Sequence, residues 1–253
     1  MRVTILGCGP SYGVPSLSAG FGKCSSQNPK NIRYRSSILI EEQGQNILVD
    51  APPEIRLELL RSKIKKIDAL LCTHAHFDHI AGFEDIRKWK AKEKKILDIY
   101  GRKDTLKELK DRNSFIFMGH KDKEWVKLHY IKMYHPFKIE NVSIIPIKQY
   151  HGNINSVGYR VGKFAYSTDV KSMDKKGWEL LKGIDTWVLG CVTDQMNNKH
   201  ICLDEALKWI QRIKPKHTFL THLGAELDYD TLCKKLPKNV KPVYDGMVIK
   251  IKS

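Results

Sequence analysis

The sequence of 253 residues lacks the features that would set it apart from an ordinary globular protein. No apolar stretch approaches the roughly 20 residues of a membrane helix, and there is no internal repeat or low-complexity tract. The first residues carry no long apolar segment after their single basic residue, so we expect a cytoplasmic protein without a membrane partner. With 42% hydrophobic residues, the chain can bury a sizeable core.

Paired cysteines and interdomain linkers are also missing. The six cysteines are scattered without any C-x-x-C pair, which favours buried reduced thiols over disulfides or a zinc knuckle. No stretch rich in proline, glycine and serine divides the chain into two parts. We therefore expect a single domain over residues 1–253.

Acidic residues are scarce relative to basic ones. The chain has 44 Lys and Arg against 28 Asp and Glu, a net charge of +16 that would attract anionic substrates. The excess can also be compositional, because lysine, isoleucine and asparagine are all abundant. Residues 87–138 hold 16 basic and 7 acidic residues. We interpret residues 88–138, approximately, as a basic insert, and a nucleic acid would bind there if it binds at all.

Short β-type runs alternate with helical patterns, which predicts an α/β fold. Most candidate polar residues come soon after an apolar run: Asp50 after 47–49, His74 after 70–72, His151 after the run to 147, Asp169 after 164–166, and His222 after 219–220. Loops at strand ends hold functional side chains on a rigid scaffold. We therefore expect these residues to meet at one edge of a sheet.

The strongest motif is Thr-His-Ala-His-Phe-Asp-His at residues 73–79. His74 and His76 project to the same side of an extended segment, whereas Asp78 and His79 lie where the chain turns into a helix. Imidazole and carboxylate are ligands that zinc and similar divalent ions prefer. The motif therefore predicts a metal-dependent hydrolase with two neighbouring groups of ligands.

With the strand-end residues around it, this motif resembles the metallo-β-lactamase superfamily, whose fold is an αββα four-layer sandwich. The resemblance covers essentially the whole chain. Four further stretches, 7–15, 28–37, 158–160 and 200–206, resemble the branch that includes phosphoribosyl 1,2-cyclic phosphate phosphodiesterase. That branch adds a structural zinc on N-terminal cysteines and a later histidine. Here only Cys24 and Ala225 are available, so no structural zinc is expected.

The resemblance implies two divalent metal ions, with zinc as the first choice and manganese as the alternative. The implied ligands are His74, His76 and His151 for one ion, Asp78, His79 and His222 for the other, and Asp169 as a bridge. Asp50 would orient the metal-binding loop, although it could instead cap a helix that starts near Pro53. Asp78 and His200 are the implied catalytic residues, with His200 acting as an imidazolium that contacts the substrate phosphate or the leaving group, unless it is an ordinary loop histidine.

The implied activity is hydrolysis of a small or cyclic phosphodiester by attack of a metal-bridging hydroxide. A tRNA 3′-processing endonuclease of the same superfamily is the alternative, because a polyanionic substrate would account for the charge. A catalytically silent, metal-stabilised binding module is a third possibility. The expected partner is a small phosphodiester, and a homodimer is left open. Arg33 and Arg35 are expected to be solvated rather than bound to phosphate.

Overall fold

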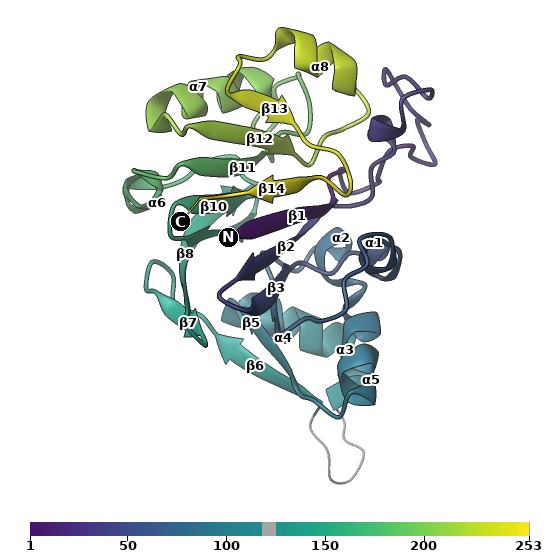
Figure 1. The fold of residues 1–253 in the computed structure, drawn as a ribbon, viewed down its shortest axis with the longest axis vertical. Helices are drawn as coiled ribbons and strands as arrows, with labels where there is room; N and C mark the ends of the chain where they lie inside the picture. Colours follow the sequence, from purple (N-terminus) through teal and green to yellow (C-terminus); the bar gives the residue numbers. More distant parts are fainter. Residues whose placement is uncertain (118–124, 253) are drawn as a thin grey trace.

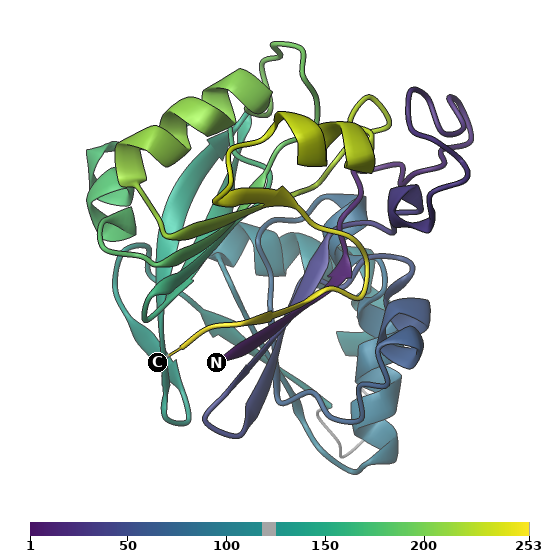
Figure 2. The same cartoon turned by 45° about the horizontal axis from the view of Figure 1, so that its top comes forward.

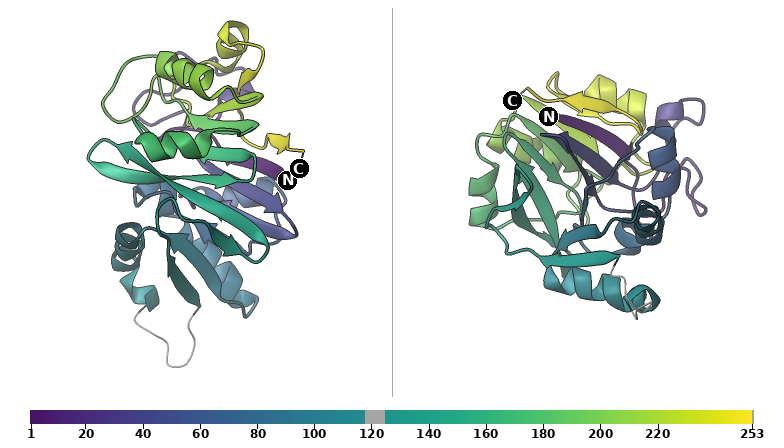
Figure 3. Two further views of the ribbon diagram at one scale, coloured as in Figure 1. Left: turned by 90° about the vertical axis from the view of Figure 1, so that its left-hand side faces the viewer. Right: turned by 60° about the horizontal axis from the view of Figure 1, so that its bottom comes forward.

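Two seven-stranded sheets form the centre of the computed structural model, which describes residues 1–117 and 125–252 (Figure 1). The first sheet has the spatial order β14 (Val248–Lys250), β1 (Arg2–Gly7), β2 (Ser37–Glu42), β3 (Gln45–Val49), β4 (Ala69–Leu71), β5 (Leu97–Gly101) and β6 (Val126–Tyr130). The second has the order β13 (Val240–Pro242), β12 (His217–Thr221), β11 (Thr186–Gly190), β10 (Phe164–Ser167), β9 (Ile154–Val161), β8 (Val142–His151) and β7 (Phe137–Ile139). The last strand pairs with the first, so the two ends of the chain lie side by side (Figure 3).

Helices connect the strands and cover the outer faces of both sheets. They are the 3-10 helix η1 (Pro29–Asn31) and the α-helices α1 (Ile55–Arg61), α2 (Phe77–Ile80), α3 (Phe83–Lys92), α4 (Lys103–Arg112), α5 (Ser114–Phe117), α6 (Lys175–Leu181), α7 (Leu203–Ile213) and α8 (Tyr229–Lys235). Among the described residues, no helix combines the length and the apolar character that a membrane crossing requires.

Three apolar cores separate the structure into four layers. Because side chains alternate along a strand, Ile47 and Val49 of β3 face the core between the sheets, whereas Leu48 faces the core beneath α1, α3 and α4. A third core lies between the second sheet and α6, α7 and α8. The two sets of helices lie on opposite sides of the paired sheets (Figure 2). The predicted αββα four-layer sandwich is therefore confirmed.

Parallel strands position the site. The strands from β3 to β6 run parallel in the first sheet, and those from β10 to β13 run parallel in the second. The carboxyl ends of parallel strands meet at one edge of a sheet, and ligands bind at that edge in α/β folds. β8 points the same way as β10, because both are antiparallel to the β9 strand between them. The loops after these strands therefore converge.

The region predicted as a basic insert, residues 88–138, contributes to the first sheet. β5 and β6 extend this sheet beyond β4, and α4 packs on its outer face. Residues 118–124 of the region lie outside the described residues. Only the basic charge of this region was singled out from the sequence, although polar and apolar residues alternate along β5 and β6 as they do in half-buried strands. The assignment of a single domain to residues 1–253 stays a prediction.

Glu58 of α1 is a buried acid without a compensating hydrogen bond. It is fully buried, and neither carboxyl oxygen has a hydrogen-bond partner among the described residues. Burial raises the pKa of Glu58 well above its ordinary value, and the nearby carboxylates of Asp245 and Glu54 raise it further. The Glu58 carboxyl is therefore protonated over a wider pH range in the folded protein than in the unfolded chain.

We expect Glu58→Gln to weaken the pH dependence of stability. As the pH rises above the ordinary carboxyl pKa of about 4.3, the unfolded chain releases a proton that the folded protein keeps, so the wild-type protein loses stability until the raised folded pKa is passed. The neutral glutamine does not titrate. In urea unfolding at about pH 5 and about pH 8, the variant should gain roughly 1–3 kcal/mol relative to wild type at the higher pH. The exposed Glu140→Gln is the control. A variant with the wild-type pH slope would contradict the prediction.

Candidate metal centre

The predicted site residues meet at the edge where strands of both sheets end. The first sheet supplies Asp50 after β3 and residues 73–79 after β4, and the second sheet supplies His151 at the end of β8, Asp169 after β10, His200 between β11 and α7, and His222 after β12. Four groups have ligand atoms within 4.8 Å of one another: His74, His76 and His151; His74, His79 and Asp169; Asp78, His79 and His222; and His151, Asp169 and His200. Every predicted ligand belongs to at least one of these groups.

Asp169 lies between two sets of histidines. One carboxylate oxygen, Oδ2, is 3.1 Å from Nε2 of His79 and 3.2 Å from Nε2 of His222. The other oxygen, Oδ1, is 3.6 Å from Nε2 of His151 and 3.6 Å from Nδ1 of His200. The two oxygens of one side chain therefore face different histidines, which is the arrangement that a carboxylate bridging two cations requires.

Several buried nitrogens at the centre have no hydrogen-bond partner among the described residues. They are Nε2 of His79 and both ring nitrogens of His222. Burying polar atoms without partners is costly, so their presence in one place points to a ligand that satisfies them. Imidazole nitrogen with carboxylate oxygen is a donor set that zinc and manganese accept. The residues present therefore fit divalent metal ions.

Asp50 anchors the histidine loop. Its carboxylate accepts hydrogen bonds from the backbone N–H of Thr73 and the Thr73 hydroxyl, both at 2.8 Å, and it lies 2.6 Å from Nδ1 of His79. Because the Thr73 hydroxyl donates to Asp50, it can accept from Nδ1 of His74, 3.0 Å away. Both imidazoles are thus held through Nδ1, and Nε2 of each faces the centre. Asp50 does not cap α1, whose N-cap is Glu54.

A backbone carbonyl orients a third histidine. Nδ1 of His151 donates to the carbonyl oxygen of Lys199 at 2.8 Å, which leaves Nε2 facing the centre. His76 is half-exposed, and its Nδ1 lies 2.9 Å from Nε2 of His74. The histidine nitrogens that these hydrogen bonds leave available for a metal ion therefore converge on the centre.

The electrostatics of the centre reflect its crowding. Burial alone would raise the pKa values of Asp78 and Asp169, but neighbouring His79 and His222 bring both below their ordinary value. Burial also acts to lower the pKa of His79, yet Asp169, Asp50 and Asp78 together raise it. The pKa of His74 falls well below its usual range, because of burial and of His79 beside it. A proton on His79 therefore supplies positive charge that a cation would otherwise provide.

The sequence also matches a known family over most of the site. The model of the β-lactamase superfamily domain matches residues 45–223, which include every predicted metal ligand and Asp50. The chain belongs to the metallo-β-lactamase superfamily. Members of this superfamily are metal-dependent hydrolases, so the coarse prediction of a hydrolase with a metal-binding fold is confirmed.

Two curated relatives and one solved structure show the similarity in more detail. An octanoyltransferase of Porphyromonas gingivalis is 30% identical over 98% of this chain and 51% of its own length. A ribonuclease Z of Clostridium kluyveri is 29% identical over 68% of this chain and 50% of its own length. The chain thus spans about half the length of these relatives. A crystal structure of a diphosphatase from the PhnP family has a TM-score of 0.92 and 30% identity, covering 99% of this chain and 98% of that one. The predicted resemblance to this branch of the superfamily is confirmed.

Three hydroxyl groups support the superfamily site and were not singled out from the sequence. Thr73 joins Asp50 to His74, as described above. The Thr168 hydroxyl donates to Oδ2 of Asp169 at 2.8 Å, and the Ser156 hydroxyl donates to the Asp169 carbonyl oxygen at 2.7 Å. Thr73 and Thr168 immediately precede a predicted ligand, so their positions in the sequence could have pointed to this role. Ser156 is brought beside Asp169 by the pairing of β9 with β10 and leaves no such signal.

His200 lies at the centre beside two of the predicted ligands. Its side chain is 17% exposed and approaches His151 and His222, with ring centroids 4.6 Å and 5.4 Å apart. Burial lowers the pKa of His200 to about 3, against the opposing charge of Asp169. The role of His200 as an imidazolium beside a bound phosphate stays a prediction. A neutral His200 can still donate one N–H to a phosphate oxygen.

Three of the site residues have left-handed backbone conformations. The φ angles are 63° at Asp50, 49° at Asp169 and 57° at His222. Such angles are uncommon outside glycine and persist only where the surrounding structure holds them. Asp50 and His222 follow directly on a strand and Asp169 follows one residue later, so each sharp turn directs the side chain towards the centre.

The N-terminal loop contributes packing to the centre. Arg33 is 1% exposed and donates to the carbonyl oxygens of Leu223 and Gly224 at 3.2 and 2.9 Å, directly after His222. The expectation that Arg33 is solvated is therefore wrong. Cys24 is buried with its Sγ 3.4 Å from the carbonyl oxygen of Ala225. These contacts hold the His222 loop against residues 24–33.

Proposed function

We propose that the protein is a binuclear metal-dependent phosphodiesterase that acts on a small or cyclic phosphodiester. The observation that carries the proposal is the Asp169 carboxylate, whose two oxygens face different histidines. We assign one ion to His74, His76 and His151, the other to Asp78, His79 and His222, and the bridging position to Asp169. Two divalent ions, zinc by preference or manganese, would supply the Lewis acidity that activates water and neutralises charge on the phosphoryl oxygens.

The residues around the centre have distinct roles in this proposal. Asp50 and Thr73 hold His74 and His79 through Nδ1, so that Nε2 of each faces the centre. His200 donates its N–H to a nonbridging phosphate oxygen or to the leaving oxygen. Since burial lowers its pKa to about 3, His200 acts as a neutral donor until a bound phosphate changes its surroundings. Asp78 is the carboxylate ligand beside His79 and His222.

Two other phosphorus–oxygen bonds are candidates. The similar diphosphatase of the PhnP family supports a phosphoanhydride. The similar ribonuclease Z supports tRNA, for which the basic residues between 88 and 138 would supply the contacts. The chain also resembles an octanoyltransferase over about half of that protein, but the histidine and aspartate groups described above favour hydrolysis over acyl transfer.

A substrate panel combined with metal analysis tests the proposal. The protein is loaded with zinc or manganese, the bound metal is counted by mass spectrometry, and methyl p-nitrophenyl phosphate, a ribose cyclic phosphate, a dinucleoside diphosphate and a precursor tRNA are offered. We expect about two ions per chain and faster turnover of a small phosphodiester than of tRNA.

The outcomes separate the candidates. Fewer than about one ion per chain after loading would contradict the binuclear centre. Preferred turnover of tRNA, lost when Lys92, Lys94 and Lys95 are changed to glutamate, would establish the endonuclease instead. Metal binding without turnover of any substrate would leave a silent binding module.

A further inference from the structure

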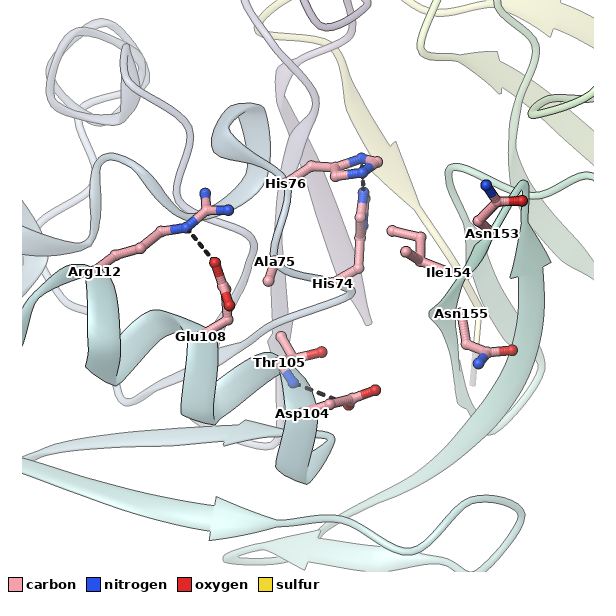
Figure 4. A pocket seen from close by; sticks show the side chains of 10 residues that line it. All are labelled: His74, Ala75, His76, Asp104, Thr105, Glu108, Arg112, Asn153, Ile154 and Asn155. Carbon is pink, nitrogen blue, oxygen red and sulfur yellow. Dashed lines mark hydrogen bonds and ion pairs between the residues drawn. The ribbon is translucent and has the colours of Figure 1, made fainter.

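A cavity opens directly beside the proposed metal ligands and is not used by the chemistry described so far. It has a volume of about 340 Å³ and includes His74 and His76 in its lining. Figure 4 shows its two walls: α4 with Glu108 and Arg112 on one side, and the turn between β8 and β9 on the other. His76 belongs both to the proposed metal ligands and to the lining of the cavity. A group attached to a phosphate at the metal centre would therefore enter this cavity.

The charges on the α4 wall are already paired. The Arg112 guanidinium donates through Nε to Glu108 at 2.8 Å, one turn away on the helix. Asp104 accepts two hydrogen bonds from Arg102, at 2.9 and 2.6 Å. Phosphate recognition normally uses arginine or lysine whose charge is not neutralised within the protein. The wall is therefore poorly suited to a second phosphate or to a polyanion.

The opposite wall offers neutral hydrogen-bonding groups and an apolar surface. Asn153 of the β8–β9 turn and Asn155 at the start of β9 line the cavity, and their side-chain amides have no hydrogen-bond partner among the described residues. Ile154 lies between them in the sequence and is 37% exposed. Each free amide presents both donors and an acceptor, and an exposed aliphatic side chain can pack against a flat ring.

We infer that this cavity is the subsite for an uncharged group that carries hydroxyls and amide-like edges, as the sugar and base of a nucleoside do. The inference rests on the proposed phosphodiesterase function and specifies its substrate class. Asn153 and Asn155 select the substrate by hydrogen bonding to this group, and Ile154 contacts its apolar face. A pocket of about this volume accommodates a ligand of that size. The structure thus favours a nucleoside-bearing phosphodiester over a polynucleotide.

Two probes with the same leaving group test the inference. Thymidine 5′-(p-nitrophenyl phosphate) carries a nucleoside where methyl p-nitrophenyl phosphate carries only a methyl group. We expect Asn155→Ala to lower the ratio of kcat/KM for the first probe to that for the second by about fivefold, and the double variant with Asn153→Ala by tenfold or more. The exposed Asn141→Ala, about 30 Å away at the other end of β8, should leave the ratio at the wild-type value.

A binding measurement keeps this inference separate from the proposed function. By calorimetry, thymidine 5′-monophosphate should bind the metal-loaded wild-type protein about tenfold more tightly than inorganic phosphate, and Asn155→Ala should reduce that difference. An unchanged kcat/KM ratio in both asparagine variants would overturn the subsite while leaving the hydrolase intact. Tighter inhibition by a short RNA than by the monophosphate would overturn it in favour of a polyanion. Absence of hydrolysis with either probe would instead overturn the proposed function, and nucleotide binding would still be measured.

Discussion

Asp78→Ala is expected to lower kcat/KM for methyl p-nitrophenyl phosphate by at least about three orders of magnitude. The Asp78 side chain is 9% exposed, and its Oδ2 lies 3.3 Å from Nε2 of His79 and 3.9 Å from Nε2 of His222. It is the only carboxylate in that group of potential ligands. Alanine would leave the two imidazoles with Asp169 as their one remaining carboxylate neighbour at the centre, so we expect one metal ion per chain to be lost.

The effect of Asp78→Ala should be specific to the centre. Asp78 belongs to the short α2 helix, and the strands that carry the other ligands do not depend on its side chain. Circular dichroism should therefore show a folded variant. The exposed Asp111→Ala is the matched control and should keep full activity. His200→Ala, which removes one neutral donor but no proposed ligand, should lose only about a hundredfold. An Asp78→Ala protein with activity within about tenfold of wild type would contradict the assignment.

The sequence allowed the arrangement of the site to be predicted because its signals are local. Residues 73–79 concentrate four potential metal ligands in one loop and the start of α2, and apolar runs precede the other candidates, so the parallel strands bring them together. The alternation of β-type runs with helical patterns predicted the α/β class, and the resemblance to the metallo-β-lactamase superfamily supplied the two sheets and their covering helices. These features depend on neighbouring residues and on the direction of strands, both of which can be inferred from a single chain.

The features that could not be predicted depend on contacts between segments that are distant in the sequence. The local sequence around each residue gives no recognisable signal of these contacts. Arg33 is buried because its guanidinium satisfies carbonyl oxygens about 190 positions away, after His222. Glu58 is buried in a helix whose pattern suggests nothing unusual. The left-handed backbone of Asp169 has no glycine to signal it in the sequence. Likewise, β6 becomes a strand only because β5 is available to pair with it.

Asp50→Ala should produce the largest loss of stability among the substitutions considered. Asp50 is fully buried and receives both hydrogen bonds of Thr73, with Nδ1 of His79 at 2.6 Å. Alanine would leave these donors buried and unpaired. In urea unfolding of the metal-free protein, we expect a loss of roughly 3–5 kcal/mol, a large part of the stability of a typical domain. The partly exposed Asp68→Ala, in the segment that leads into β4, should cost no more than about 1 kcal/mol.

Asp50→Asn distinguishes support of the fold from control of the His79 tautomer. Asparagine keeps the size of the side chain and can still accept from Thr73, so it should be more stable than the alanine variant. Its amide N–H₂, however, would face Nδ1 of His79 and favour the tautomer with the proton on Nε2, the nitrogen proposed to bind metal. Competition with a chelator should therefore show metal affinity reduced about 10–100-fold in both variants. If Asp50→Asn bound metal as tightly as wild type, Asp50 would only support the loop, because the orientation of the His79 proton would then have no bearing on metal binding.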